Sequence, residues 1–165
     1  ETLADHCHQT TNTDVLTEYC RAALAETITR QFTNTEKEIT VVMMDSSLES
    51  HLISQAQQGT LNGNTLGLTP DSIEKLYKSA STTFDGMIRQ GFDPILLTSP
   101  VLRYTMFEFL APILPDINVL SYNDISQDVQ FKTYGRLKIE DTEKVKQAPI
   151  NLEQPVTQPE EHVLA

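Results

Sequence analysis

The stretch Ile39-Thr-Val-Val-Met-Met44, followed at once by Asp45-Ser-Ser47, decides the fold. A β-branched, apolar run of this length predicts a strand. Aspartate and serine are capping residues, so a helix is expected to begin directly after the strand. Pro94-Ile-Leu-Leu-Thr98 is a second apolar run of strand length, and Ser99-Pro100 repeats the cap-then-proline start of a helix. The chain therefore contains two strand–cap–helix units.

Further elements are expected around these two units. Apolar steps of three and four residues from Asp14 to Phe32 predict one helix, with Thr13 or Asp14 as its cap. Thr69-Pro70-Asp71 is a strong helix start, and the apolar stripe that follows it ends at Gly91. Short strands are expected at Leu66 and Leu68, at 117–121 and at 129–139.

Strands that alternate with helices indicate an α/β fold. We expect a small sheet of mixed strands, covered by helices and with parallel crossovers among neighbours. A helical segment precedes this unit, and residues 1–13 are predicted to be an exposed, polar lead-in. Residues 142–165 hold prolines, acids and glutamines without apolar periodicity, which predicts a disordered acidic tail.

The charge of the chain restricts its partners. The formal net charge is −11 and the pI is about 4.6, whereas a nucleic-acid partner requires a Lys/Arg face. Anionic lipid headgroups would repel the same surface. We therefore expect protein partners, no nucleic acid, and no direct contact with a membrane.

The two cysteines, Cys7 and Cys20, are too few for a secreted disulfide scaffold, so a reducing compartment is expected. No apolar run approaches the roughly 18 residues that a membrane-spanning helix needs. The first residues do not resemble a signal peptide. The chain also opens without Met, in what resembles the middle of a domain, which suggests a piece of a longer protein.

The strongest chemical alternative is a metal- or thiol-dependent enzyme that uses His6, Cys7, His8 and Cys20. These ligand types suit zinc, and the helix expected at 14–32 could present Cys20 towards the lead-in. Paired Cys-x-x-Cys or His-x₃₋₅-His knuckles are absent from the sequence, and nothing near Cys7 marks it as an activated nucleophile. The competing interpretation is a core cysteine beside an exposed terminus.

The turns Asp45-Ser46-Ser47 and Thr98-Ser99-Pro100 offer a second alternative, a small-ligand site at the ends of the strands. Neither turn is rich in glycine, and the sequence contains no P-loop, G-x-G-x-x-G or G-x-S-x-G motif. Helix capping is the favoured explanation. No acid pair is singled out by its setting as a general acid and base, so we expect no enzyme activity, no cofactor and no metal.

Several segments resemble the type III secretion export-gate family, and flagellar members more than injectisome members. Pro94-Ile-Leu-Leu-Thr-Ser-Pro100 with Arg103-Tyr104 is the most specific, and it continues to Leu114-Pro-Asp-Ile-Asn-Val-Leu-Ser-Tyr-Asn-Asp-Ile125 and Gly135-Arg136. The other segments are Thr2-Leu-Ala-Asp5, Asp14-Val-Leu-Thr-Glu-Tyr19 with Arg21, and Thr65-Leu-Gly-Leu-Thr-Pro-Asp71. Cys20, where the family tends to have Val, and the long acidic tail depart from the family pattern.

The resemblance implies a parent protein at the cytoplasmic face of the bacterial inner membrane. Its N-terminal half spans the membrane, and its cytoplasmic half assembles into a ring of nine that receives chaperone–substrate complexes. Residues 1–34 would end the third cytoplasmic subdomain, and 35–141 would form the fourth. The last subdomain meets the stalk protein of the export ATPase, and no cofactor belongs to it.

The most family-like segments supply the candidate contact residues, because Tyr and Arg are favoured anchors at interfaces. The candidates are Arg103, Tyr104, Tyr122, Asn123 and Arg136. The alternative is that the tyrosines complete the core and that Arg103 is solvated.

Overall fold

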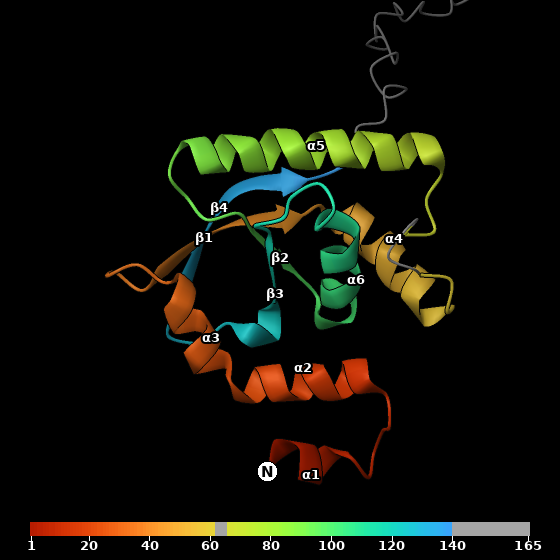
Figure 1. Cartoon of the computed structure of the whole chain (residues 1–165), viewed down its shortest axis with the longest axis vertical. Coiled ribbons are helices and arrows are strands. Elements are labelled where there is room, and N and C mark those ends of the chain that lie inside the picture. The colour runs from red at the N-terminus through yellow and green to blue at the C-terminus, as the bar shows by residue number, and fades with distance from the viewer. Residues whose placement is uncertain (62–65, 140–165) are drawn as a thin grey trace, which may run out of the picture.

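The computed structural model describes residues 1–61 and 66–139, and it confirms the α/β class (Figure 1). Three helices come first: α1 (Thr2–His6), α2 (Thr13–Ala23) and α3 (Ala25–Phe32). The α/β part then follows as β1 (Glu38–Met44), α4 (Ser46–Gln57), α5 (Pro70–Arg89), β2 (Ile95–Thr98), α6 (Pro100–Leu110), β3 (Asn118–Ser121), the 3₁₀ turn η1 (Tyr122–Asp124) and β4 (Gln130–Leu137).

The four strands form one sheet in the order β3-β2-β1-β4, and every pairing in the described part is parallel. The mixture of parallel and antiparallel pairs that we expected is not found there. The connections explain why: helical segments join each strand to the next and return the chain to the same end of the sheet, as parallel pairing requires. The last strand, β4, pairs with the first, β1, and forms one edge of the sheet.

The β1–β4 pairing contains an irregularity. Val41 pairs with Thr133, but Val42 pairs with Gly135, so Tyr134 is an extra residue in β4. The pairing recovers and runs on to Met44 and Leu137. A bulge of this kind increases the local twist of an edge strand, and β4 is such a strand.

The sheet lies between two hydrophobic layers. The larger layer is on the side of α4, α5 and α6, and α5 supplies Leu76, Ala80, Phe84 and Met87 at helical spacing. The smaller layer contains Ile39, Val41, Ile95, Leu97 and Leu120, against which Ile28 and Phe32 of α3 pack. The helical segment at the N-terminus is therefore part of the packing on one face of the sheet.

Most predicted elements are confirmed, and three predictions were wrong in detail. The helix expected over 14–32 is two helices, which meet at Leu24 with φ −101° and ψ 11°, and Asn12 is the cap of the first. Leu66 and Leu68 lie on no strand, since Leu66 adopts φ 52° in a turn. Part of the expected lead-in forms the short helix α1.

The starts of the long helices are confirmed. Thr69 caps α5 through its hydroxyl, which accepts from the N–H of Ser72 at 3.3 Å, and Pro70 follows in the first turn. Asp45 caps α4, with its Oδ1 accepting from the N–H of Ser47 at 3.0 Å. The predicted tail, residues 142–165, lies outside the described residues.

Candidate protein-binding surface

Two ion pairs attach α2 to the α/β part. The Nε of Arg103, on α6, donates to Oε1 of Glu18 at 2.5 Å, and both side chains are largely buried. One turn further along α2, Arg21 donates from Nε and Nη2 to Asp124 of η1, at 3.1 Å and 2.9 Å. Bidentate Arg–carboxylate geometry fixes orientation as well as distance. The position of α2 beside α6 and η1 is therefore specified by charge.

Asp124 is the centre of this arrangement, and its side chain is fully buried. Its Oδ2 also accepts from the N–H of Ser121 at 2.8 Å, while its backbone carbonyl accepts from the hydroxyl of Thr29 at 3.0 Å. The hydroxyl of Thr29 in turn accepts from the N–H of Ser126 at 3.0 Å. One aspartate thus joins α2, α3, η1 and the end of β3.

Glu18 has an unusual environment for a carboxylate. Burial raises its pKa, and the hydrogen bond from Arg103 opposes that rise. Its second oxygen, Oε2, is buried without a hydrogen-bond partner among the described residues. A buried carboxylate with a raised pKa can mark a catalytic acid. The burial of Glu18 is equally explained by its ion pair with Arg103, which holds α2 against α6.

Two grooves run along the α2–α6 junction, and Tyr104 borders both of them. The first, of about 560 Å³, includes Val15, Tyr19, Val101 and Tyr104 in a lining that also contains polar side chains. Val101 is 60% exposed and Tyr104 is 44% exposed. The second groove, of about 510 Å³, is lined by residues of α2, α3, α6 and β3, Phe32 and Phe107 among them.

The candidate contact residues divide into two locations. Tyr104 and Asn123 line the first groove together, although they come from α6 and η1. Tyr122 is next to Asn123 and is half-exposed, and its pKa is raised by burial and by the charge of Glu49. Arg136 lies apart from them, on β4, where it lines a hollow beside α5.

Arg103 does not offer a free guanidinium at this surface. It is buried and bonded to Glu18, so the alternative of a solvated Arg103 was wrong. It lines the second groove, and its ion pair joins α6 to α2 there.

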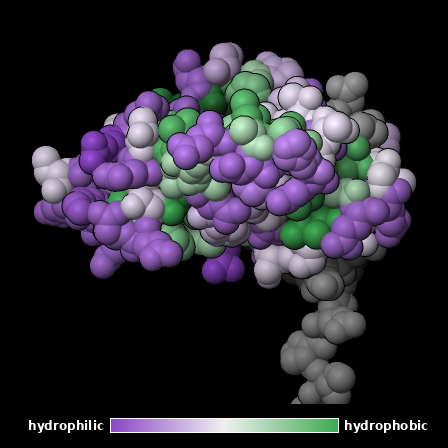
Figure 2. All heavy atoms as spheres, turned by 90° about the horizontal axis from the view of Figure 1, so that it is seen from below, coloured by the Kyte–Doolittle hydropathy of each residue, from purple (hydrophilic) through white to green (hydrophobic). Residues whose placement is uncertain are grey.

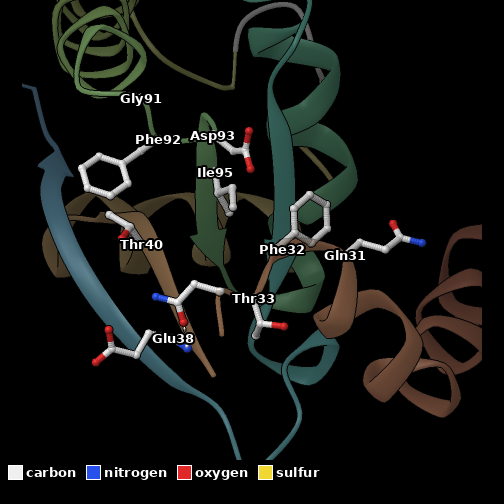
Figure 3. A pocket seen from close by; sticks show the side chains of 10 residues that line it. Gln31, Phe32, Thr33, Glu38, Thr40, Gly91, Phe92, Asp93 and Ile95 are labelled. Atoms are coloured by element: carbon white, nitrogen blue, oxygen red, sulfur yellow. Dashed lines mark hydrogen bonds between the residues drawn. The ribbon is translucent and has the colours of Figure 1, made fainter. Parts of the chain in front are cut away.

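A third hollow, of about 250 Å³, opens at the amino ends of β1 and β2 (Figure 3). Phe32 and Phe92 lie on opposite sides of it, with Ile95 between them (Figure 3). The carboxylates of Glu38 and Asp93 lie at separate margins, and Lys132 pairs with Glu38 at 2.7 Å. Its ionisable groups do not converge on one point.

Two of the four residues of the metal or thiol alternative have other partners. His6 stacks on Tyr19 with ring centroids 4.0 Å apart, and the Sγ of Cys7 donates to the carbonyl of Ala4 at 3.3 Å. Within residues 1–61 and 66–139, no group of three or more His, Cys, Asp or Glu side chains is arranged to hold a metal ion. The geometry therefore gives this alternative no support.

The second strand–helix turn is capped differently from the prediction. Ser99 makes no side-chain capping bond; instead, Oε1 of Glu49 accepts from the N–H of Ser99 at 2.8 Å and from the hydroxyl of Thr98 at 3.1 Å. A side chain from α4 thus occupies the place where a small anion would bind. No local pattern pairs Glu49 with Ser99, because the two residues are 50 positions apart in the chain.

The sequence analysis also missed Glu18 and Asp124, whose ion pairs join α2 to α6 and to η1. Both lie within segments that carry the family resemblance, which was the available signal. Their partners are 85 and 103 residues away in sequence, so no local pattern could pair them.

The class that this architecture defines is a parallel α/β module covered by helices, preceded by helices that are fixed to it by ion pairs. Residues 1–130 match the FHIPEP family, and the chain belongs to that family. It is 37% identical over 139 residues to the flagellar biosynthesis protein FlhA of Bacillus subtilis; the match covers 84% of this chain and 20% of FlhA. The predicted family is confirmed.

Solved structures show the same fold. In the complex of the Chlamydia pneumoniae proteins CdsV and CdsO, the matched chain is 28% identical, with a TM-score of 0.71 over 83% of this chain and 39% of that one. The nonameric EscV cytosolic domain from the type III secretion system has the same fold at 20% identity, with a TM-score of 0.66 over 82% of this chain and 40% of that one. The chain thus spans about a fifth of FlhA and about two fifths of the matched structures.

None of the helices in the described part combines the length and the apolar character that crossing a membrane would require.

Proposed function

We propose that this chain is the last part of the cytoplasmic half of a flagellar-type protein export gate, and that it binds proteins rather than catalysing a reaction. Its partners would be the stalk protein of the export ATPase, chaperone–substrate complexes, and neighbouring copies of itself in a ring. It would work at the cytoplasmic face of the inner membrane, anchored by a membrane-spanning N-terminal half.

One observation carries this proposal: the groove between α2 and α6, whose lining includes the partly exposed apolar and aromatic side chains of Val15, Tyr19, Val101 and Tyr104. The ion pairs on Arg103 and Arg21 hold both walls in place. A preformed groove with aromatic residues at its rim favours protein binding, because little side-chain entropy is lost when a partner is bound.

The relatives support the same class of function. FlhA is named for flagellar biosynthesis, CdsV is found in complex with another protein, and the EscV domain is nonameric. Identity with FlhA of Bacillus subtilis is 37%, against 27% with the injectisome-type protein CdsV, and this favours a flagellar system. Residues 1–34 would then belong to the third cytoplasmic subdomain and 35–141 to the fourth.

Within this proposal, Tyr104, Tyr122 and Asn123 would contact the stalk or a chaperone complex directly. Arg103 would act by holding α6 against α2 through Glu18. Arg136 would contribute at a separate surface, since it lies on β4 beside α5.

The test uses the complete cytoplasmic half of the protein and immobilised stalk protein. We expect Tyr104→Ala to weaken binding about tenfold or more, as loss of an aromatic anchor does. Phe131→Ala, on β4, is the matched control, because Phe131 is exposed to the same degree but lies outside the grooves. Deletion of residues 35–141 should abolish binding.

Unchanged binding after that deletion would exclude a role for this module in stalk docking. Equal weakening by Tyr104→Ala and Phe131→Ala would mean that the α2–α6 groove is not the contact site. The same two variants, tested against chaperone–substrate complexes, separate the two classes of partner.

A further inference from the structure

The third hollow, at the amino ends of β1 and β2, has an aromatic side chain on each of two opposite sides (Figure 3). Phe32 ends α3 and packs against the smaller hydrophobic layer. Phe92 is 43% exposed and follows the end of α5, where Gly91 adopts φ 83° and the N–H of Phe92 donates to the carbonyl of Met87 at 3.2 Å. A helix end closed in this way sets the direction of the next residue. The fold therefore determines the positions of both rings.

The same hollow carries negative charge. Two carboxylates belong to its lining, Glu38 and Asp93, and the described lining contains no lysine or arginine. Lys132 already pairs with Glu38 at 2.7 Å, whereas Asp93 makes no hydrogen bond or ion pair within the described residues. The formal net charge of the chain, −11, adds to the local field. A cation is therefore the ligand that this hollow fits.

The lining also restricts the kind of cation. No group of three or more His, Cys, Asp or Glu side chains could hold a metal ion in the described part of the chain. The volume, about 250 Å³, is below the roughly 300–1,000 Å³ of pockets for drug-sized ligands, so one side chain is a suitable occupant. A guanidinium stacks on aromatic rings, is weakly hydrated and donates two hydrogen bonds to one carboxylate. Thr40, also in the lining, has a hydroxyl oxygen that can accept another.

We propose that this hollow binds the side chain of an arginine from a partner protein, with the guanidinium between Phe32 and Phe92 and paired with Asp93. The partner is a different protein rather than a second copy, because two chains of net charge −11 repel each other. Phe32 also lines the second groove, so the arginine would extend a contact made along the α2–α6 junction.

The test is an NMR titration of the 165-residue chain with Nα-acetyl-arginine N-methylamide, followed through the backbone amides of Thr40, Phe92 and Asp93. We expect saturable shifts. The lysine derivative should bind at least about threefold more weakly, because its ammonium group is compact and strongly hydrated. The matched probe is the citrulline derivative, which has a similar shape without the charge and should leave the three resonances in place.

Variants assign the binding to the two features of the hollow. Asp93→Asn keeps the shape and removes the charge, and it should weaken arginine binding about tenfold. Phe92→Leu keeps an apolar side chain but removes the ring, and it should weaken binding about threefold. Asp116→Asn is the matched control for charge, because Asp116 is an exposed acid outside the lining. Phe131→Ala is the control for the ring, because Phe131 is 45% exposed and also lies outside the lining. Neither control should change binding.

Equal shifts with the arginine and citrulline probes, or equal effects of Asp93→Asn and Asp116→Asn, would overturn the proposal. Tighter binding of free arginine than of the blocked derivative would overturn it in favour of a small-molecule ligand. Shifts of the same resonances when the protein alone is concentrated would overturn it in favour of a second copy. None of these results depends on stalk or chaperone binding, so the outcome is independent of the proposed function.

Discussion

Asp124 illustrates how one residue can determine the position of several elements. Its buried carboxylate accepts from Arg21 and from the N–H of Ser121, and its carbonyl accepts from Thr29. Asp124→Ala would leave Arg21 without its counter-ion and the N–H of Ser121 without its acceptor. We expect a loss of about 3 kcal/mol in the free energy of unfolding, measured by urea denaturation.

The exposed pair between Glu26 and Arg30 provides the matched control, because it has the same chemistry but both side chains are more than two thirds exposed. Glu26→Ala should cost no more than about 0.5 kcal/mol. Equal losses for Asp124→Ala and Glu26→Ala would show that Asp124 does not hold α2 and η1 together.

Asp128 gives a prediction at the same scale that depends on pH. Lys37 donates to its Oδ2 at 2.6 Å and Ser126 donates to its Oδ1, and these bonds lower its pKa to about 2. Because the folded pKa is below the unfolded value of about 3.9, the stabilisation is present above pH 4 and is lost as the pH falls towards 2.

Titration followed by the carboxyl ¹³C shift should therefore place Asp128 near pH 2 in the wild-type protein. Lys37→Ala should raise that pKa the most, since the hydrogen bond from Lys37 is the largest cause of the shift, and Ser126→Ala should raise it less. An Asp128 that titrates at its ordinary pKa in the wild type would contradict the geometry.

At the scale of elements, α5 tests the packing of the sheet. Its buried residues Leu76, Ala80, Phe84 and Met87 form one stripe, and Ile88 on the same helix is 46% exposed. Phe84→Ala should cost about 3–5 kcal/mol, because it removes a fully buried aromatic ring and leaves a cavity. Ile88→Ala should cost far less. Thermal unfolding of the two variants decides whether α5 faces the sheet in this register.

Elements with local signals could be predicted from the sequence. Thr69-Pro70 and Asp45-Ser46 mark helix starts that the structure confirms, because a cap acts on its own first turn. The break at Leu24 could not be predicted, since the apolar spacing continues across it and only tertiary contacts redirect the chain. Ile28 and Phe32 must reach the sheet, while Glu18 and Arg21 must reach α6 and η1.

Part of the candidate site could also be predicted from the sequence, and part could not. The family-like segments included Tyr104 and Asn123, which the structure brings to one groove from separate elements. The sequence could not indicate that Arg103 is buried, because its partner Glu18 lies in a different helix. Local sequence patterns also could not show whether each strand pair is parallel or antiparallel, since the pairing of β1 with β4 joins distant parts of the chain.

At the scale of the whole molecule, the N-terminal helices leave apolar side chains uncovered. Leu3 and Leu24 are each 55% exposed, and hydrophobic patches interrupt the mostly hydrophilic face that Figure 2 shows from below. In the proposed parent protein, the preceding part of the third subdomain would cover these side chains. In the 165-residue chain they should promote self-association instead.

Analytical ultracentrifugation over a range of concentrations tests this expectation. The double variant Leu3→Ser/Leu24→Ser should lower the average mass at high concentration, because it makes both exposed positions polar. Phe131→Ser is the control, because Phe131 is an exposed aromatic residue on β4 rather than on the N-terminal helices, and it should leave association unchanged. If all three substitutions act alike, association follows general hydrophobicity. If only the N-terminal pair acts, the exposed leucines mark the face at which the rest of the cytoplasmic half would join this chain.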